Sequence, residues 1–331
     1  MPSYRRIVLA SRPSGAASMS NFRLEEVQTP GLQEGQVLIR NEWLSLDPYM
    51  RGRMNESKSY AAAQPLGEVM IGGTAGSVVE SRHPQYRAGD KVVGYLGWQE
   101  FGVSDGTGIY KVDARVVPLS AYLGAVGMPG VTAWYGLNKI IAPKEGETIL
   151  VSSASGAVGG VVGQLAKIAG CRAVGIAGGA EKCGYVVAEL GFDACIDYKT
   201  QDVNRALKDA APQGVDGYFE NVGGNIMNAV LPRMNAFGRV ALCGLIAGYD
   251  GEPIPITNPT WFLVSRLRMQ GFIVSEHMDV WPTALKELGS HVIAGRIKYR
   301  ESIAHGIESA PQAFLGMLRG ANFGKQLVKL S

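Results

Sequence analysis

A regular alternation of apolar runs and helical patterns across residues 147–295 limits the possible folds more than any other feature of the chain. Apolar runs of strand length stand at 147–154, 171–179, 194–200, 214–223, 238–248 and 268–276. Segments with helical spacing lie between or after them, at 159–170, 180–191, 203–212, 225–238 and 281–295. Continuous apolar strands joined by helices indicate a parallel sheet covered on both faces, with right-handed crossovers. The sequence therefore predicts a doubly wound α/β domain of the Rossmann type.

The segment before this alternation, residues 4–117, has a different pattern. Short apolar or alternating runs at 35–46, 70–81 and 88–104 are separated by Gly, Pro, Asn and Asp, which is typical of a compact β-rich domain. The tail carries strand, helix and strand signals in turn. A chain of 331 residues is long enough for two cores. We expect a β-rich domain at 1–125, completed by 296–331, and an α/β domain at 126–295.

Composition argues against several classes of partner. The chain is 46% hydrophobic and 18% charged, with a formal net charge of +3, so it lacks the charge excess of a nucleic-acid-binding protein. No segment approaches the roughly 18–20 uninterrupted apolar residues of a membrane helix. The apolar run near the N-terminus is too short for a signal-peptide core. We therefore expect a cytoplasmic protein, away from membranes, whose partners are small molecules or copies of itself.

The spacing of cysteine and histidine argues against a metal enzyme. The four cysteines, Cys171, Cys183, Cys195 and Cys243, form no CxxC pair and are interpreted as thiols in a reducing compartment. The four histidines are scattered, and none is spaced to share a zinc site with a neighbouring cysteine. No bound metal is expected.

A glycine-rich turn joins the first strand of the α/β pattern to its helix. It has Ala154, Gly156 and Gly159 where the dinucleotide fingerprint has three glycines. Gly156 would let a pyrophosphate approach the backbone, Gly159 would let the helix pack closely on the strand, and the helix N-terminus would supply amide donors. A fingerprint lacking one glycine is a weak signal by itself. The strand before it and the helix after it favour dinucleotide binding over a purely structural turn.

The end of the second strand indicates which dinucleotide to expect. About 20 residues past the turn, NAD-binding proteins carry an acid that accepts from the ribose 2′-hydroxyl. Here the chain has Gly178-Gly179 instead. The missing carboxylate removes repulsion against a 2′-phosphate, and Lys182 can supply a counter-charge, so these residues predict NADP(H). The alternative for Lys182 is a solvated lysine at a helix start, beside Glu181.

Polar residues follow three further predicted strands. Tyr198 follows the third strand, Asn221 ends the fourth, and Tyr249 follows the fifth. Open parallel sheets bind ligands at the carboxyl ends of their strands, so all three are candidate site residues. Because Asn favours turns and Tyr is common at the rims of sheets, each of them is equally compatible with a structural role.

Five motifs carry a resemblance that covers essentially the whole chain. They are "LDPYMR" at 46–51, "GMPGVTAWYGL" at 127–137, "SGAVGGVVGQLAK" at 155–167, "DGYFENVGG" at 216–224 and "GANFGKQLVKL" at 320–330. Together they resemble the zinc-independent medium-chain dehydrogenase/reductases, in the branch of leukotriene 12-hydroxydehydrogenase, prostaglandin reductase and curcumin reductase, also called NADPH-dependent 2-alkenal or double-bond reductases. The resemblance implies a GroES-like domain built from both ends of the chain, a Rossmann domain between them, and a homodimer.

Carried over by motif, the resemblance implies a set of residues that bind NADP(H). Those at the pyrophosphate are Gly156, Ala157, Val158 and Gly159, and those at the 2′-phosphate are Lys182 and Tyr198. The rest of the cofactor is implied to contact Thr132, Asn221, Cys243, Gly244, Leu245, Ile246, Ala247, Gly248, Tyr249, Phe272, Ile273, Val274 and Asn322. One departure is Ala180, where relatives often have a polar residue, so Lys182 is expected to be the main phosphate ligand.

The chemistry expected without a metal is conjugate reduction. Hydride addition to the β-carbon of an α,β-unsaturated ketone or aldehyde develops negative charge on the carbonyl oxygen. A phenol with a pKa of about 10 stays protonated at neutral pH, so Tyr249 is the candidate catalytic donor to that oxygen and a substrate contact. Tyr49 is a second candidate substrate contact, with packing as its alternative. The substrate is expected to be an apolar enone or enal.

Two alternative functions remain open at this point. An NADPH-dependent quinone oxidoreductase would share the fold, the cofactor and the lack of zinc. A non-catalytic NADPH-binding protein would share the scaffold, because a fold alone does not establish an activity.

Overall fold

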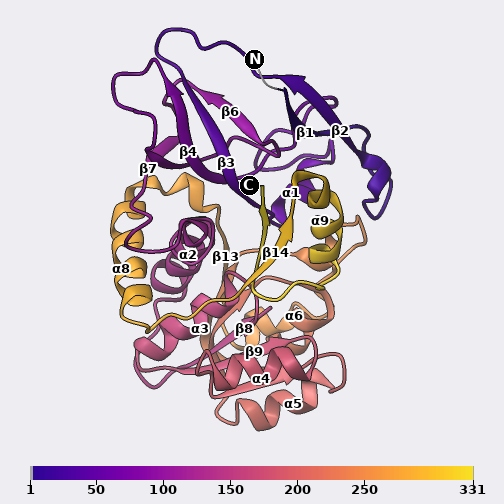
Figure 1. Ribbon diagram of the computed structural model, residues 1–331. Helices are drawn as coiled ribbons and strands as arrows, with labels where there is room; N and C mark the ends of the chain where they lie inside the picture. The colour runs from indigo at the N-terminus through magenta and orange to yellow at the C-terminus, as the bar shows by residue number, and fades with distance from the viewer. Residues whose placement is uncertain (1–2, 331) are drawn as a thin grey trace. The chain divides into compact units, whose positions relative to one another are not determined.

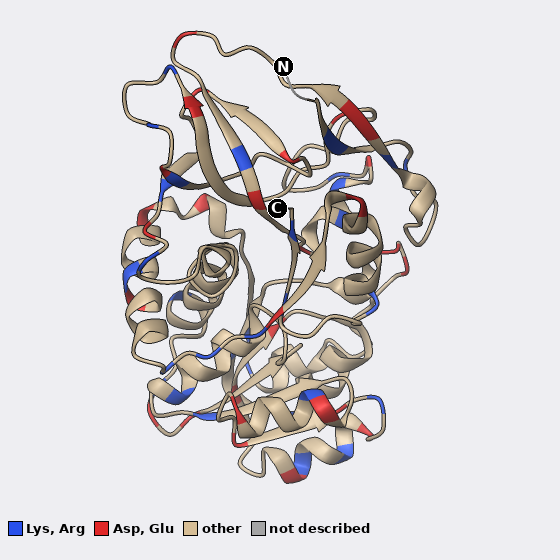
Figure 2. Ribbon diagram, in the orientation of Figure 1, with Lys and Arg blue, Asp and Glu red and all other residues tan. Residues whose placement is uncertain are grey.

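The computed structural model describes residues 3–330, which divide into two compact units (Figure 1). The first unit comprises the chain up to Leu123 and the chain from Glu301 onward, and the second is Gly124–Arg300. Within each unit, basic and acidic side chains are interspersed along the chain (Figure 2), in keeping with the small net charge. No helix within residues 3–330 has both the length and the apolar character needed to cross a bilayer.

The first unit is built mainly of β-strands. β1 (Ser3–Leu9) and β2 (Phe22–Gln28) form an antiparallel ribbon. A larger sheet has the order β14-β15-β3-β4-β5-β7, and β6 also pairs with β3. Its strands are β3 (Val37–Ser45), β4 (Thr74–Ser81), β5 (Lys91–Gly94), β6 (Phe101–Ser104), β7 (Ile109–Lys111), β14 (Glu301–His305) and β15 (Lys325–Lys329). The helices of this unit are α1 (Tyr49–Arg53) and α9 (Ala310–Leu318), with 3₁₀ turns at Met19–Asn21, Leu119–Leu123 and Ile307–Ser309.

The two ends of the chain share the larger sheet of the first unit. β15 pairs antiparallel with β3, with Leu327 opposite Ser45 and Lys329 opposite Trp43, and β14 pairs parallel with β15. Beneath the sheet, the Trp98 ring stacks on Phe22 at 5.5 Å between centroids and meets Phe314 of α9 edge-on at 5.5 Å. The C-terminal tail is therefore a structural part of the N-terminal β-domain.

The second unit contains a parallel sheet with the order β10-β9-β8-β11-β12-β13. Its strands are β8 (Thr148–Ser152), β9 (Arg172–Ala177), β10 (Ala194–Asp197), β11 (Val215–Glu220), β12 (Met234–Leu242) and β13 (Arg268–Gly271). Its helices are α2 (Met128–Tyr135), which continues as a π-helix at Gly136–Ile141, α3 (Gly159–Ile168), α4 (Ala180–Ala188), α5 (Val203–Ala210), α6 (Gly224–Val230), α7 (Thr260–Val264) and α8 (Trp281–Ile293). This is the doubly wound Rossmann order, which reverses between β8 and β11, and the predicted fold class is confirmed.

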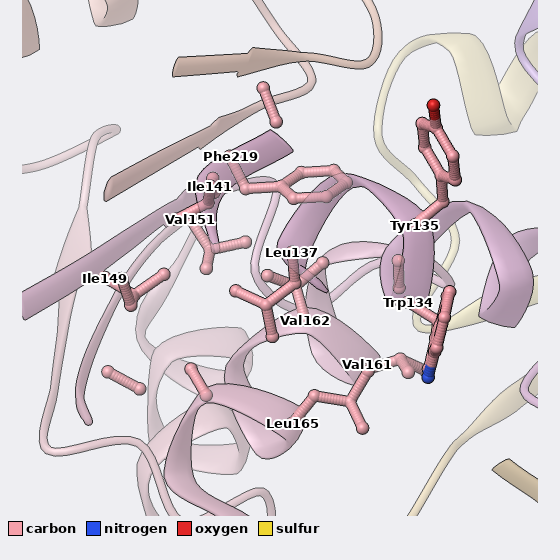
Figure 3. Packing of buried hydrophobic residues seen from close by; sticks show 14 of the residues in the cluster. Trp134, Tyr135, Leu137, Ile141, Ile149, Val151, Val161, Val162, Leu165 and Phe219 are labelled. Atoms are coloured by element: carbon pink, nitrogen blue, oxygen red, sulfur yellow. The ribbon is translucent and has the colours of Figure 1, made fainter. Parts of the chain in front are cut away.

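One core of the second unit lies where β8 and β11 meet the helices (Figure 3). Burial of each large apolar side chain in this core stabilises the folded state by about 1.5–3 kcal/mol. The buried residues labelled in the close-up include Leu137, Ile141, Ile149, Val151, Val161, Val162, Leu165 and Phe219. Because α3 contributes its apolar face to this core, its N-terminus is held at the carboxyl end of β8.

Several predicted element boundaries are wrong. The predicted strand at 238–248 lies too late in the chain, because β12 spans Met234–Leu242. The predicted helix at 225–238 is too long, since α6 ends at Val230, a 3₁₀ turn spans Leu231–Arg233 and β12 begins at Met234. Pro232 lacks the backbone N–H that a continuing helix needs. The predicted strand at 268–276 is also too long, because β13 ends at Gly271. After it Phe272 turns its ring into the core, against Tyr135 and Phe219.

Candidate functional site

The strand order of the second unit reverses between β8 and β11, where sheets of this kind bind ligands outside the carboxyl ends of the strands. Asn221 joins these two strand ends. Its backbone amide donates to the Ser152 hydroxyl at 2.8 Å, and its side-chain Nδ2 donates to the Ser152 carbonyl at 2.8 Å. The structure thus fixes the predicted site residue Asn221 at the point of reversal.

Glu220, which the sequence reading missed, is fully buried directly before Asn221. Its carboxylate accepts from the Ser152 hydroxyl at 2.7 Å, from the Tyr218 hydroxyl, and from the amides of Val222 at 2.5 Å and Gly223 at 3.0 Å. A buried carboxylate is costly unless donors surround it, and these donors meet that need. Glu220 therefore sets the turn that carries Asn221. The sequence does carry a signal for this role, because Glu220 is an acidic residue within the predicted strand, directly after apolar residues, in "YFENVGG".

The glycine-rich turn after β8 is closely packed against its own backbone. A Cβ at Gly159 would lie 2.4 Å from the Ser153 carbonyl oxygen, and one at Gly156 would lie 3.1 Å from the same atom. Ala157 and Val158 are half-buried and lie between these two glycines, directly before α3. No side chain caps α3. The amides of Gly160 and Val161 already donate to the carbonyls of Gly156 and Val158, so the amides placed to meet a pyrophosphate are those of the preceding turn, from Ala157 to Gly159.

The alanine in place of the first fingerprint glycine has a structural explanation. Ala154 is fully buried, and its amide donates to the Ile176 carbonyl of β9 at 3.0 Å. A Cβ at Gly175 would lie 2.8 Å from the Ala154 methyl group. The small residue that the close approach of β8 and β9 requires is therefore supplied by Gly175, and the turn keeps its shape with Ala154.

The turn after β9 is held from the neighbouring strand. The Asp197 carboxylate, at the end of β10, accepts from the amide of Gly179 at 2.7 Å and of Lys199 at 3.0 Å. The Gly179 hydrogen bond is the main reason that the pKa of Asp197 lies below its usual value. Gly179 has a φ of +104°, which favours glycine. An acid at the end of the neighbouring strand β10 is thus used to hold the backbone of this turn.

Tyr198 and two lysines surround the same turn. A Cβ at Gly178 would lie 2.9 Å from the Tyr198 hydroxyl, so the glycine leaves room for that phenol. Lys182, in the first turn of α4, has a pKa below the usual lysine value, first because of burial and then because of the charge on Lys199. The charge on Lys199 thus acts on Lys182, and two neighbouring cations suit an anion. Lys199 was missed, although it directly follows Tyr198.

The predicted loop after β12 runs along the carboxyl edge of the sheet. It contains Cys243, Gly244 and Leu245 followed by a 3₁₀ turn at Ile246–Gly248 and Tyr249. Cys243 and Gly244 donate to the Glu220 carbonyl, and Ala247 donates to the Val222 carbonyl at 3.0 Å. A Cβ at Gly244 would lie 3.3 Å from the Asn221 carbonyl oxygen and 3.6 Å from the Tyr249 hydroxyl. The Tyr249 phenol thus reaches back over Gly244 toward Asn221.

Other predicted cofactor residues of the second unit are partly committed to packing. The Thr132 hydroxyl donates to the Met128 carbonyl within α2 at 2.8 Å. Phe272 and Val274 are buried in the core, and Ile273 between them is half-buried. The Trp281 indole donates to the Val274 carbonyl at 3.2 Å. At 272–274, contacts with a ligand would therefore come mainly from the backbone and from Ile273.

Two predicted site residues belong to the first unit. The Tyr49 hydroxyl, at the start of α1, has no hydrogen-bond partner among residues 3–330, and burial raises the pKa of this phenol well above its usual value. The segment before it is fixed by the buried Lys325, which donates to Asp47 at 2.7 Å and to the Leu46 carbonyl at 2.8 Å. Asn322 lies in the loop before β15, where its Nδ2 donates to the Gly324 carbonyl at 2.8 Å.

The second unit therefore offers a donor set that fits a dinucleotide with a phosphate on its adenosine ribose. The uncapped α3 and its glycine turn suit a pyrophosphate, while Lys182 and Lys199 supply positive charge at the end of the neighbouring strand. Within the described range, no group of three or more His, Cys, Asp or Glu side chains is arranged to hold a metal ion.

Comparison with known proteins shows the family. Two family models match, one described as the N-terminal domain of oxidoreductase over residues 5–112 and one as zinc-binding dehydrogenase over 157–290. The chain is 48% identical to the NADPH-dependent curcumin reductase of Escherichia coli, with 99% of this chain and 97% of the relative covered. It is a medium-chain dehydrogenase/reductase.

Further similarities of this medium-chain dehydrogenase/reductase confirm the branch expected from its motifs. It is 40% identical to the NADP⁺-dependent 2-alkenal reductase of Nicotiana tabacum, covering 99% of this chain and 98% of the relative. It is 44% identical to prostaglandin reductase 1 of Rattus norvegicus, covering 95% of both. The structure of CurA from Vibrio vulnificus in complex with NADPH superposes with a TM-score of 0.94 at 43% identity over 99% of both chains. An Escherichia coli quinone oxidoreductase, at 20% identity and a TM-score of 0.80 over 98% of this chain and 99% of its own, shares the fold.

Proposed function

We propose that this protein reduces the C=C bond of α,β-unsaturated ketones or aldehydes with NADPH. The observation that carries the proposal is the Tyr249 phenol, which reaches over Gly244 toward Asn221 at the reversal point of the sheet. The chain belongs to a branch whose named members are NADPH- or NADP⁺-dependent reductases, which supports the same chemistry. When bound, the nicotinamide supplies hydride to the substrate's β-carbon.

The residues proposed to hold the cofactor divide by its chemical groups. The turn from Gly156 to Gly159, whose last amide begins α3, would bind the pyrophosphate. Lys182, with Tyr198 beside the glycine turn, would bind the 2′-phosphate. Lys199 is added to this group because its charge acts on Lys182. Asn221, held by Ser152, would orient the nicotinamide end.

The chain's own contribution to the chemical step is a hydrogen-bond donor. Negative charge develops on the substrate oxygen during conjugate reduction, and a donor aimed at that oxygen stabilises the transition state more than the ground state. Tyr249 is proposed for this role, since a protonated phenol can donate without a change in its charge. Tyr49 is proposed as a substrate contact, because its buried hydroxyl has no hydrogen-bond partner among residues 3–330 and a carbonyl would supply one.

The proposal is tested by following NADPH consumption with alkenals, aryl enones and 1,4-quinones, together with identification of each product. The expected result is saturation of the C=C bond of apolar enones, with the carbonyl retained. A protein that consumes NADPH only with quinones would instead be a quinone oxidoreductase. A protein that binds NADPH but consumes none with any member of the panel would be a non-catalytic binding protein.

We also propose a cytoplasmic homodimer. In the described chain, the outer edge of β13 pairs with no other strand, and large apolar side chains near it are exposed, namely Phe237 at 66%, Leu263 at 78% and Val264 at 53%. An open edge flanked by exposed apolar groups favours pairing with a second copy. Light scattering should give twice the mass of the 35.3 kDa chain. The free thiols support a reducing compartment, which cell fractionation would test.

A further inference from the structure

Two of the four cysteines lie against each other in the second unit. Cys183 is in the first half of α4, Cys195 is in β10, and their sulfur atoms are 3.1 Å apart with both thiols free. A disulfide bond is about 2.05 Å long, so roughly 1 Å of closure would join them. α4 packs directly on β10, so the fold itself brings together two thiols twelve positions apart.

This pair flanks the residues proposed to bind the 2′-phosphate. Lys182 directly precedes Cys183, and the Cys183 amide donates to the Gly179 carbonyl at 3.1 Å. Tyr198, which lies against Gly178, follows Cys195 by three positions. Any movement that joins the two sulfurs therefore acts on the segments that carry both phosphate ligands.

We propose that Cys183 and Cys195 form a reversible disulfide that weakens binding of NADPH at its 2′-phosphate. The proposed oxidant is a small-molecule disulfide. One cysteine thiolate attacks it, releases one thiol and forms a mixed disulfide, and the other cysteine then displaces the second thiol. Two protein thiols lose two electrons and two protons in total, and the small disulfide gains them as two thiols.

The surroundings of the pair explain why the thiols are stable in the reduced protein. Burial raises the pKa of both Cys183 and Cys195, and the Asp197 carboxylate raises both further. Exchange needs a thiolate, so the pair reacts slowly at neutral pH and responds to sustained rather than brief oxidising conditions. Cys171 and Cys243 serve as control thiols, because their neighbours are not cysteines. The Cys171 thiol donates to the Lys144 carbonyl, and Cys243 lies beside Glu220.

The effect on the cofactor follows from linkage. If the disulfide weakens NADPH binding, bound NADPH must protect the pair from oxidation by the same factor. Because the affected segments face the 2′-phosphate, NADH binding should change little. This inference rests on the proposed NADP(H) site, and it can fail while enone reduction stands, since it is measured by binding and by mass.

The experiment compares the reduced full-length protein with protein equilibrated in oxidised glutathione. Non-reducing peptide mapping should show a Cys183–Cys195 linkage, and titrations followed by fluorescence should show NADPH affinity lower by roughly fivefold or more. Reduction should restore the affinity, and a saturating amount of NADPH should lower the fraction of protein that carries the linkage at equilibrium. Cys183→Ser should abolish the change, whereas Cys171→Ser should retain it.

Three results would overturn the inference. The first is the absence of the linkage at equilibrium, and the second is a linkage that leaves NADPH affinity unchanged. The third is an equal loss of NADPH and NADH affinity, since that would mean a general distortion of the domain. Because the main comparison uses wild-type protein in two redox states, none of these results depends on the folding of a variant.

Discussion

The two glycine turns of the second unit, after β8 and after β9, use glycine for different reasons. In the first, a Cβ at Gly159 would meet the Ser153 carbonyl at 2.4 Å, so the chain's own backbone requires glycine. In the second, Gly178 makes room for the Tyr198 phenol, and Gly179 adopts a φ of +104°. The first turn is shaped by local geometry and suits any dinucleotide. The second is shaped by neighbouring segments, and in the proposed function it selects the phosphate of NADP(H).

The largest expected effect comes from Gly159→Ala. The added methyl group has no space beside the backbone of Ser153, and overpacking of this kind costs up to about 3 kcal/mol. NADPH and NADH affinities should both fall by roughly a hundredfold in fluorescence titrations. Gly160→Ala is the matched control, because its Cβ would meet the flexible end of Leu190 at 3.2 Å and the Ala154 carbonyl oxygen at an ordinary contact distance of 3.5 Å. If Gly159→Ala lowered the affinity for NADPH but not for NADH, the first turn would not be the one that suits any dinucleotide.

Lys182→Ala should act on the second turn alone. A charge-assisted hydrogen bond contributes about 1.5–3 kcal/mol, so the ratio of NADPH to NADH specificity constants should fall by roughly thirtyfold. NADH kinetics should stay near wild type. Lys208→Ala removes an exposed lysine from α5 and serves as the control for net charge. An unchanged ratio in Lys182→Ala would leave this lysine as a solvated helix-start residue.

Tyr249→Phe tests the chemical step independently of the cofactor binding assigned to the two turns. Loss of the proposed donor should lower enone turnover by roughly tenfold or more, while the dissociation constant of NADPH stays the same. Tyr198→Phe should show the opposite pattern, with weaker NADPH binding and a nearly normal rate at saturating cofactor. If Tyr249→Phe kept wild-type turnover with cofactor binding intact, another group would have to be the donor.

The smallest expected effect is that of Lys199→Ala. Lys199 is exposed, and exposed charge pairs contribute at most about 1 kcal/mol, so NADPH affinity should fall by about fivefold or less. The loss should shrink further in high salt, because exposed charges are screened. Titrations at two ionic strengths test both statements. An effect larger than that of Lys182→Ala would reverse the roles assigned to the two lysines.

The sequence predicted the fold class and the family because both depend on local patterns. Apolar runs separated by helical spacing specified the parallel sheet, and the turn with Gly156 and Gly159 was recognisable from its spacing. Element ends were less predictable. Apolar residues continue past Gly271, but the strand ends there because its pairing with β12 ends at Leu242, and that pairing is formed only in the folded domain.

By itself, the sequence determined the doubly wound domain, the glycine turn and the absence of an acid after the second strand. Only the tertiary structure revealed that Gly175 compensates for Ala154, that Glu220 fixes Asn221, and that Cys183 lies 3.1 Å from Cys195. The physical reason is separation along the chain. The spacing of residues along one segment shows which of them lie in the same helix, strand or turn. Contacts between strands depend instead on how the sheet brings distant segments together.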